Sequence, residues 1–270
     1  MTRPFRPGER VVLADSKGRR YLLALSEGGS FHSHTGIVEH EAVLGGEDGV
    51  TVRSTTGARY TAMRPTLADF VVQMPRGAQV IYPKDLGAIL MLADVHPGVR
   101  VLEAGVGSGA LSLALVRAGA EVVGYEVRAD FAERARANVS AFLGEEAVTS
   151  RYRVEATDVY AGIAERGLDS IVLDLPEPWQ VVKHAESALR RGGILVAYTP
   201  SVLQVAHLRE VLATSAFELA ETVEFLVRTW HVEGQAVRPD HRMVAHTGFL
   251  TSARLLGPVP GGLKPARTPR

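Results

Sequence analysis

Residues able to bind a nucleotide gather between positions 99 and 126. Gly105, Gly107 and Gly109 occur at every second position after a largely apolar run. Glycine lets the backbone turn sharply and approach a ligand where a Cβ would collide. A helix after such a turn directs its free N–H groups at the ligand. Glu126, at the end of the next apolar run, is placed to accept hydrogen bonds from a ribose diol. These residues predict a nucleotide-type site.

The glycine turn alone fits two classes of ligand. Residues 105–110 read GVGSGA, which matches the G-x-G-x-x-A fingerprint of dinucleotide-binding domains, and Glu126 has the usual spacing for a ribose contact. With Glu103 in front, the same stretch fits E-x-G-x-G-x-G, the pattern of S-adenosylmethionine-dependent methyltransferases. An NAD-dependent oxidoreductase and a methyltransferase are both open at this point.

A second motif, DLPEPW at residues 174–179, favours methyl transfer to a base nitrogen. Asp174 offers a polar side chain to the nitrogen edge of a flipped-out base, and stiff prolines hold Trp179 where it lines or stacks on the ring. Hydride transfer has no need of such a group. The plainer alternative is a proline-rich loop with a packing tryptophan, although loops at strand ends commonly carry function.

Alternating strands and helices must position these motifs. The predicted strands cover 99–103, the run ending at 126, 152–155, 170–173 and 194–198, and the predicted helices cover 110–118, 130–143, 179–189 and 201–214. This alternation predicts an α/β fold with a mostly parallel, Rossmann-like sheet and ligands at the carboxyl ends of its strands. Two β-rich runs, 217–228 and 247–255, are expected to pair antiparallel at the sheet edge.

The rest of the chain divides into three further regions. Residues 1–64 predict a small β-barrel-like domain with hairpins over 16–18 and 56–58. Residues 65–98 predict a helical lead-in to the main domain at 99–255, with helices after Pro65 and from about residue 84. Residues 256–270, rich in proline, glycine and basic side chains, predict a flexible tail.

The composition excludes some kinds of site and indicates where the protein works. The chain has 270 residues, no cysteine and a formal net charge of zero, so it has no disulfide framework or thiolate metal site. No apolar run approaches the ~18 residues of a membrane span, so we expect a cytoplasmic protein without a membrane partner. Overall charge gives no support to a nucleic-acid partner, although both ends of the chain are basic and local patches can bind phosphate.

Three histidines lie close together near the amino terminus. His32, His34 and His40 would suit a metal ion, but no carboxylate pattern or second cluster completes the set. Surface or turn histidines are the better interpretation. We therefore expect no bound metal.

Several motifs together resemble one family, the bacterial and archaeal tRNA (adenine-58-N1)-methyltransferases. The resemblance runs from GGSFHSHTGIVEHEAVLG at 28–45 to MVAHTGFL at 243–250. Between them, in order and at family-like spacing, stand RPTLADFVVQMPRGAQVIYPKD, VLEAGVGSGALS, GYEVR, DLPEPW and AYTPSVLQV.

The resemblance implies a class I methyltransferase domain, S-adenosylmethionine as cofactor, tRNA as substrate and a homotetramer. It implies cofactor contacts from the glycine loop and the start of the following helix, namely Gly105, Gly107, Ser108, Gly109, Ala110 and Leu111. It also places Glu126 on the ribose, Asp158 near the adenine ring and Phe131 on the cofactor side. Asp174 matches the catalytic aspartate, with a further contact to the cofactor, and Tyr82 matches an active-site tyrosine. Four further residues are expected toward the tRNA: Arg64, Arg76, Lys84 and His246.

Two other classes remain as alternatives. An NAD-dependent oxidoreductase would need a His/Lys/Tyr constellation after the fourth strand, where only Lys183 and His184 occur. A non-catalytic tRNA-binding subunit would be expected to lose the glycine loop or the acidic residue of DLPEPW, and both are intact. Methylation of a small molecule is disfavoured by the additional amino-terminal domain.

Overall fold

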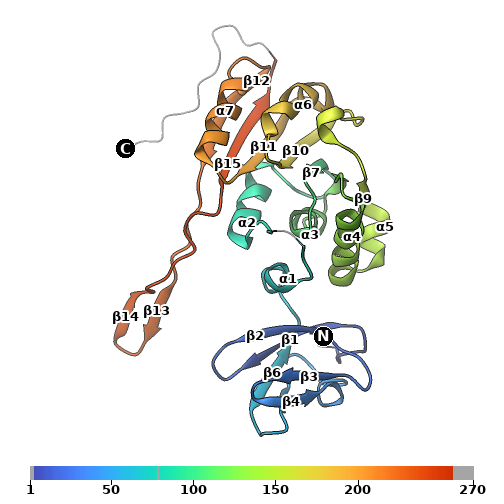
Figure 1. The fold of residues 1–270 in the computed structure, drawn as a ribbon, viewed down its shortest axis with the longest axis vertical. Helices are drawn as coiled ribbons and strands as arrows, with labels where there is room; N and C mark the ends of the chain where they lie inside the picture. Colours follow the sequence, from blue (N-terminus) through green and yellow to red (C-terminus); the bar gives the residue numbers. More distant parts are fainter. Residues whose placement is uncertain (1–2, 78, 258–270) are drawn as a thin grey trace. The chain divides into compact units, whose positions relative to one another are not determined.

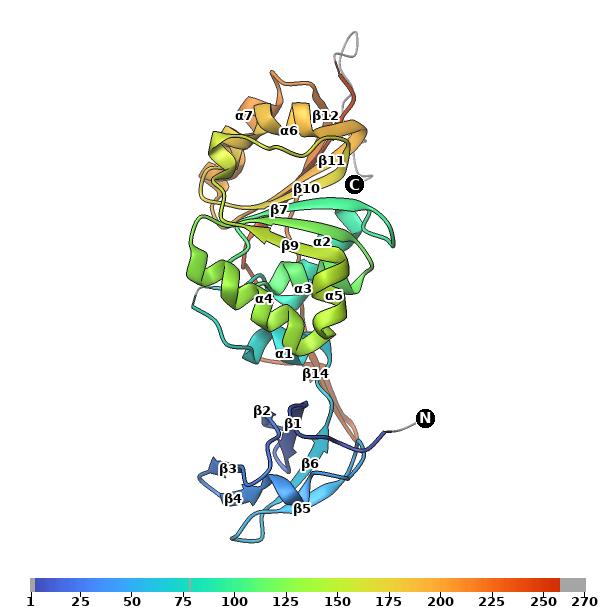
Figure 2. The same cartoon turned by 90° about the vertical axis from the view of Figure 1, so that its right-hand side faces the viewer.

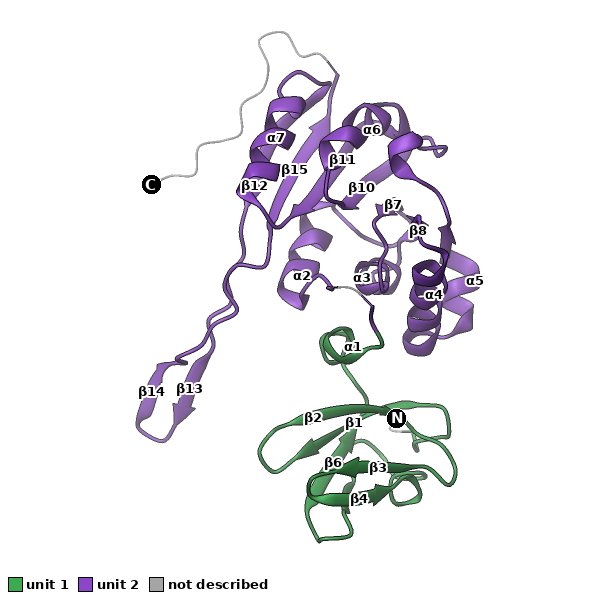
Figure 3. Ribbon diagram, viewed as in Figure 1, with its two compact units in different colours: residues 1–75 green, residues 76–270 purple. Residues whose placement is uncertain are grey.

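The chain forms two compact units, Met1–Pro75 and Arg76–Arg270 (Figure 3). The structure is a computed structural model that describes residues 3–77 and 79–257. Helix α1 (Leu67–Gln73) belongs to the first unit, so the region 65–98 is shared between the two. Most of the tail at 256–270 lies outside the described residues.

The first unit is built from antiparallel strands. Its larger sheet has the order β2-β1-β6-β5 and contains both predicted hairpins, β1 with β2 and β5 with β6, which are confirmed. A second sheet is the hairpin of β3 and β4. The bounds are β1 (Arg10–Asp15), β2 (Arg20–Ala24), β3 (Ser30–Ser33), β4 (Gly36–Glu39), β5 (Thr51–Arg53) and β6 (Arg59–Met63), with a 3-10 turn η1 (His40–Ala42). Alternating apolar side chains from these strands, Val11, Leu13, Val52 and Tyr60 among them, form one small core.

A capping box fixes the start of helix α1, and a proline fixes its end. The Thr66 hydroxyl accepts a hydrogen bond of 3.1 Å from the Asp69 N–H, and the Asp69 carboxylate accepts one of 3.1 Å from the Thr66 N–H. This reciprocal pair satisfies two N–H groups that the first turn leaves free. Pro75 then prevents the helix from continuing.

The second unit contains a seven-stranded sheet of order β12-β15-β11-β10-β7-β8-β9. The five strands β7 to β11 run parallel to one another. Strand β15 runs antiparallel to both of its neighbours, β11 and β12. The bounds are β7 (Arg100–Ala104), β8 (Glu121–Tyr125), β9 (Tyr152–Glu155), β10 (Leu168–Asp174), β11 (Leu189–Thr199), β12 (Phe217–Val223) and β15 (Phe249–Leu255). The predicted Rossmann-like sheet with an antiparallel edge is confirmed.

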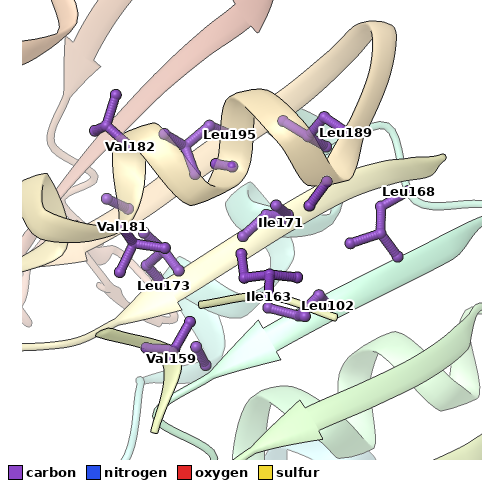
Figure 4. Packing of buried hydrophobic residues seen from close by; sticks show 14 of the residues in the cluster. Leu102, Val159, Ile163, Leu168, Ile171, Leu173, Val181, Val182, Leu189 and Leu195 are labelled. Carbon is purple, nitrogen blue, oxygen red and sulfur yellow. The ribbon is translucent and has the colours of Figure 1, made fainter. Parts of the chain in front are cut away.

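Helices cover both faces of this sheet. Helices α2 (Pro83–Leu92), α3 (Ala110–Arg117) and α4 (Ala129–Leu143) lie on one face, and α6 (Val182–Ala188) and α7 (Val202–Leu212) lie on the other (Figure 2). Short elements complete the unit: α5 (Glu145–Arg151), η2 (Val159–Ala161) and η3 (Pro178–Val181). The core against α6 is aliphatic, with Leu102, Ile171 and Leu195 on the strands and Val182 on the helix (Figure 4). This rigid core holds the strand ends that carry the predicted motifs.

The first predicted edge strand is shorter than expected. The β-rich run 217–228 leaves the sheet after Val223, and the segment 224–248 forms an arm. Its tip is a hairpin of β13 (Trp230–Glu233) and β14 (Ala236–Pro239), which projects away from the edge of the sheet (Figure 1). A strand that leaves its sheet has no cross-strand partner there, so the backbone at the tip of the arm pairs within its own hairpin. No helix in the described part of the chain is long and apolar enough to cross a membrane.

Candidate active site

The carboxyl ends of the parallel strands bring most of the predicted residues together. A pocket of about 280 Å³ is lined by Gly105, Glu126, Asp158 and Asp174 together with Arg128 and neighbouring polar and apolar side chains. A smaller adjoining pocket shares Gly105 and Asp174 and is lined by further predicted residues, namely Gly107, Ser108, Ala110 and Leu111. Strands β7, β8, β9 and β10 deliver these residues because parallel strands end at the same edge of a sheet.

The glycine loop has the backbone geometry that its spacing predicts. Gly105 has φ +85°, and a Cβ there would lie 2.1 Å from the carbonyl oxygen of Asp174, so only glycine fits against the end of β10. Gly107 has φ +54° with open space on the Cβ side, which leaves its backbone accessible to a ligand. Gly109 has φ +84° and precedes the first turn of α3.

Glu126 holds the loop from the end of β8. Its Oε2 accepts a hydrogen bond of 2.9 Å from the Gly107 N–H, and its Oε1 accepts one of 3.1 Å from the Arg128 N–H. The side chain is 5% exposed, so its carboxylate is fixed by these bonds at the edge of the larger pocket. A ribose at this edge would meet a pre-oriented acceptor.

Asp174 ends β10 with its carboxyl group directed to both pockets. It accepts no hydrogen bond from a side chain or backbone group within residues 3–77 and 79–257. Burial raises the pKa of Asp174 to about 7. The Asp174 side chain is only partly exposed, and a partly desolvated carboxyl without a protein partner is unfavourable, so a ligand in these pockets is well placed to supply the missing bond.

Glu103 presents a similar group one strand away. Its Oε2 accepts a hydrogen bond of 2.6 Å from the Ser112 hydroxyl, while its Oε1 is buried without a partner in the described structure. Burial raises the pKa of Glu103 to about 8. Since Glu103 lines the smaller pocket, its free oxygen is a second indication that a polar ligand belongs there.

The chemistry of the lining discriminates between the two candidate ligands. Four carboxyl groups surround the two pockets, Glu103, Glu126, Asp158 and Asp174, against one guanidinium, Arg128, which pairs with Glu126 at 3.3 Å. The pyrophosphate of NAD would bring negative charge among these acids, which carboxylates repel at close range. S-adenosylmethionine has no phosphate, and its ammonium, sulfonium and ribose hydroxyl groups match acceptors. The residues present therefore fit the methyl donor.

A tyrosine that the motifs did not single out lies beside Asp174. Tyr198 pairs in register with Asp174 across β10 and β11, and Tyr82 lies nearby as the residue before helix α2. Burial, with nearby Asp85, Asp174 and Tyr82, raises the pKa of Tyr198 to about 12, although its bond to the Thr247 carbonyl acts in the other direction. The sequence signal for Tyr198 was its place at the end of a strand next to the strand of Asp174, inside AYTPSVLQV.

Comparisons with known proteins agree with this geometry. A family model described as "tRNA methyltransferase complex GCD14 subunit" matches residues 60–238, and a TrmI-like N-terminal model matches residues 4–52. The tRNA (adenine(58)-N(1))-methyltransferase TrmI of Thermus thermophilus is 40% identical over 247 residues, covering 90% of this chain and 96% of that protein. The chain belongs to the tRNA (adenine-58-N1)-methyltransferase family.

Other members and solved structures extend the likeness over the whole chain. The tRNA (adenine(57)-N(1)/adenine(58)-N(1))-methyltransferase of Methanocaldococcus jannaschii is 34% identical and covers 90% of this chain and 94% of its own. The structure of a Thermotoga maritima SAM-dependent O-methyltransferase matches with a TM-score of 0.88 at 31% identity, over 99% of this chain and 97% of that one. The Aquifex aeolicus tRNA (m1A58) methyltransferase TrmI matches with a TM-score of 0.82 at 28% identity, over 93% and 98%. The glycine loop thus belongs to a methyltransferase and not to an NAD-dependent oxidoreductase.

Three aromatic side chains predicted for the site, Tyr82, Phe131 and Trp179, line neither of these two pockets. Phe131, in the first turn of α4, is covered by the guanidinium of Arg128 at 3.5 Å from its ring centroid, and it lines neither pocket. Trp179 stacks on His207 of α7, with ring centroids 4.3 Å apart and planes inclined by 26°, and it packs against the core of the sheet. The plainer interpretation of Trp179, as a packing residue, therefore agrees with its position.

Several basic residues expected toward the tRNA have protein partners. The side chain of Lys84 is only 6% exposed and pairs with Asp85 at 2.8 Å. Arg64 pairs with Asp48 at 2.6 Å and with Glu9 at 2.9 Å. Because its ammonium group is buried against Asp85, Lys84 is not available to bind a tRNA phosphate.

The amino-terminal histidines are engaged separately. His40 is buried and its Nδ1 accepts a hydrogen bond of 3.1 Å from the Ser26 N–H, while His32 lies 3.0 Å from the Ser30 hydroxyl and His34 lies 3.0 Å from Arg19. Within the described ranges, no group of three His, Cys, Asp or Glu residues is arranged to hold a metal ion.

Proposed function

We propose that this chain transfers a methyl group from S-adenosylmethionine to N1 of adenine 58 in the T-loop of tRNA. One observation carries the proposal: the partly exposed carboxyl of Asp174, which has no hydrogen-bond partner among the described residues, opens into the pocket that Glu126 and the glycine loop also line. A cofactor site and an acceptor for a base therefore meet at one side chain. Family membership supports the same reaction.

The residues of the first pocket bind and orient the cofactor. S-adenosylmethionine, when bound, supplies a methyl group on a positively charged sulfur. Glu126 accepts hydrogen bonds from the ribose, Asp158 lies on the adenine side and the Gly107 backbone permits close approach. Because methyl transfer is an in-line displacement, holding the reacting atoms in line is the main task of these residues.

Asp174 and the tyrosines receive the target base. N1 of adenine is engaged in the tRNA fold, so the base must be extruded to react. The Asp174 carboxylate accepts a hydrogen bond from the exocyclic amino group, which orients the ring and stabilises the positive charge that methylation creates. Tyr82 and Tyr198 enclose the ring beside it, each with an apolar face and a polar tip.

Nucleoside mapping tests the reaction. Purified protein is incubated with S-adenosylmethionine and an unmodified tRNA transcript, and the RNA is digested and analysed by mass spectrometry. We expect 1-methyladenosine in the T-loop fragment and none in a matched transcript with guanosine at position 58. Methylation of the guanosine transcript at equal yield, or none in either, would contradict the proposal.

A thermal-shift comparison tests the cofactor independently of RNA. A ligand that binds only the folded state raises the melting temperature by mass action. We expect S-adenosylmethionine to stabilise the protein and NAD at the same concentration to leave the melting temperature unchanged. Stabilisation by NAD alone would overturn the assignment.

We further propose that the enzyme works in the cytoplasm as a homotetramer and that the arm supplies contacts between copies. The arm at 224–248 exposes large apolar side chains, including Leu226, Trp230, Val232, Val237 and Met243. Exposed apolar side chains in this number on one short segment are costly in water and typical of a protein interface. A second copy of the chain offers the same apolar hairpin, so two arms could cover one another about a twofold axis.

A further inference from the structure

The arm is tied at both of its ends to the first turn of helix α2. At one end, the ammonium group of Lys84 donates a hydrogen bond of 2.7 Å to the carbonyl oxygen of Phe225. At the other end, the hydroxyl group of Thr247 donates one of 2.6 Å to Oδ2 of Asp85. Lys84 and Asp85 also bind each other at 2.8 Å, so one buried ion pair links the two ends.

From Thr247 the chain of contacts continues to the catalytic edge. The Tyr198 hydroxyl donates a hydrogen bond of 2.6 Å to the carbonyl oxygen of Thr247. Gly248 lies against the Tyr198 ring so closely that a Cβ there would come within 2.4 Å of it. Tyr198 therefore has little freedom as long as residues 247 and 248 hold their place, and it pairs in register with Asp174.

The same turn of α2 fixes Tyr82. The carbonyl oxygen of Tyr82 accepts hydrogen bonds from the N–H groups of Asp85 at 2.9 Å and Leu86 at 3.0 Å. The side chain of Asp85 is fully buried, so it is held by its partners and not by solvent. A shift of Asp85 would move the backbone that carries Tyr82.

We propose that Asp85 and Thr247 are positioning residues, which place Tyr82 and Tyr198 about the target base and make the root of the arm part of the active-site scaffold. The proposal rests on the proposed function, which puts the two tyrosines beside the base. In this proposal the buried Lys84–Asp85 pair anchors the arm to helix α2 and does not contact tRNA. A partner that docks on the arm would then act on catalysis through its root.

Paired substitutions at position 247 test the proposal. Thr247→Val keeps the side-chain shape but removes the hydroxyl that binds Asp85, while Thr247→Ser retains that hydroxyl; both retain the carbonyl that binds Tyr198. Since small misplacement of reacting groups costs on the order of a hundredfold in rate, we expect kcat to fall roughly tenfold to a hundredfold in Thr247→Val and to recover in Thr247→Ser. The Kd for S-adenosylmethionine should stay within about twofold of wild type, because Thr247 lines neither cofactor pocket.

Thr222→Val is the matched control. It also removes one edge-strand hydroxyl, which is bonded to Thr251 at 2.8 Å, but this bond joins β12 to β15 and not to α2. Equal losses of kcat in Thr222→Val and Thr247→Val would overturn the proposal, as would an unchanged kcat in Thr247→Val. In a Tyr82→Ala background, Thr247→Val should lower kcat little further, because Thr247 acts through the position of Tyr82. A fully additive loss of kcat in the double variant would also contradict the proposal.

Amide hydrogen exchange separates this inference from the proposed function. Exchange at residues 84–86 should be faster in Thr247→Val than in wild type or Thr247→Ser. If wild type makes no 1-methyladenosine, the proposed function fails, yet faster exchange would still support the anchoring of α2. Unchanged exchange in Thr247→Val would overturn the anchoring whatever the activity.

Discussion

The carboxylate of Glu126 binds the N–H of Gly107 at 2.9 Å, so the proposed ribose acceptor also holds the glycine loop. The two groups come from different strand ends, β8 and β7, and meet only because these strands are neighbours in the sheet. One side chain thus shapes the loop and lines the pocket.

Replacing Glu126 should weaken cofactor binding. Glu126→Ala removes the acceptor for the ribose and the bond that orders the loop, so we expect the Kd for S-adenosylmethionine to rise about tenfold to a hundredfold, measured by isothermal titration calorimetry. Glu121→Gln is the control, because Glu121 begins the same strand at the opposite edge of the sheet. An unchanged Kd in Glu126→Ala would exclude the ribose contact.

The rate should follow the ionisation of Asp174. The pKa of Asp174 is raised to about 7 by burial, and the ionised form is the stronger acceptor for the adenine amino group and the form that stabilises the positive charge of the methylated base. We therefore expect kcat/KM to rise with pH up to about 7 and to level off above it. Asp174→Asn should lose roughly a hundredfold or more in kcat and show no such rise. A wild-type profile that is flat between about pH 5.5 and 8.5 would argue against this role.

Glu103 should make the cofactor-free protein less stable as pH rises. Burial raises the pKa of Glu103 from its ordinary 4.5 to about 8 in the folded state. Between these values the folded state keeps a proton that the unfolded chain has released, so stability is full below pH 4.5 and is lost as pH rises through 8. Glu103→Gln keeps an acceptor for Ser112 but cannot titrate.

Urea denaturation at two pH values checks this expectation. Glu103→Gln should be more stable than wild type at about pH 9, by on the order of 2 kcal/mol, and the difference should shrink toward about pH 5. A constant difference across this range would show that Glu103 does not change its protonation on unfolding.

Polar substitutions on the arm should reduce the size of the assembly. The triple variant Trp230→Ser, Val232→Ser and Val237→Ser removes apolar surface that is more than half exposed in the single chain. We expect the mass by light scattering to fall from four copies to fewer, because the proposed contact depends on burial of these side chains. The control Val202→Ser with Leu203→Ser changes two equally exposed residues of α7 and should keep the wild-type mass.

Local patterns in the sequence were sufficient for most of the catalytic unit. The glycines at 105, 107 and 109, the acid at 126 and the apolar runs before them lie within 28 consecutive residues, numbered 99 to 126, and the structure reproduces their strand, turn and helix. Such segments are predictable because their burial pattern and turn chemistry are local properties of the chain. Asp174 was predictable for the same reason, as an acid at the end of an apolar strand.

Long-range contacts decided the rest. Tyr198 lies beside Asp174 only through strand register, and Lys84 is held away from the surface by partners 1 and 141 residues away. The arm replaced part of an expected edge strand for the same kind of reason. A β-rich run reads alike whether it pairs within a sheet or leaves it, because strand propensity mainly reports packing against neighbours. The sequence by itself determined which groups could do chemistry; the tertiary structure determined which of them are buried, paired and brought to the same edge of the sheet.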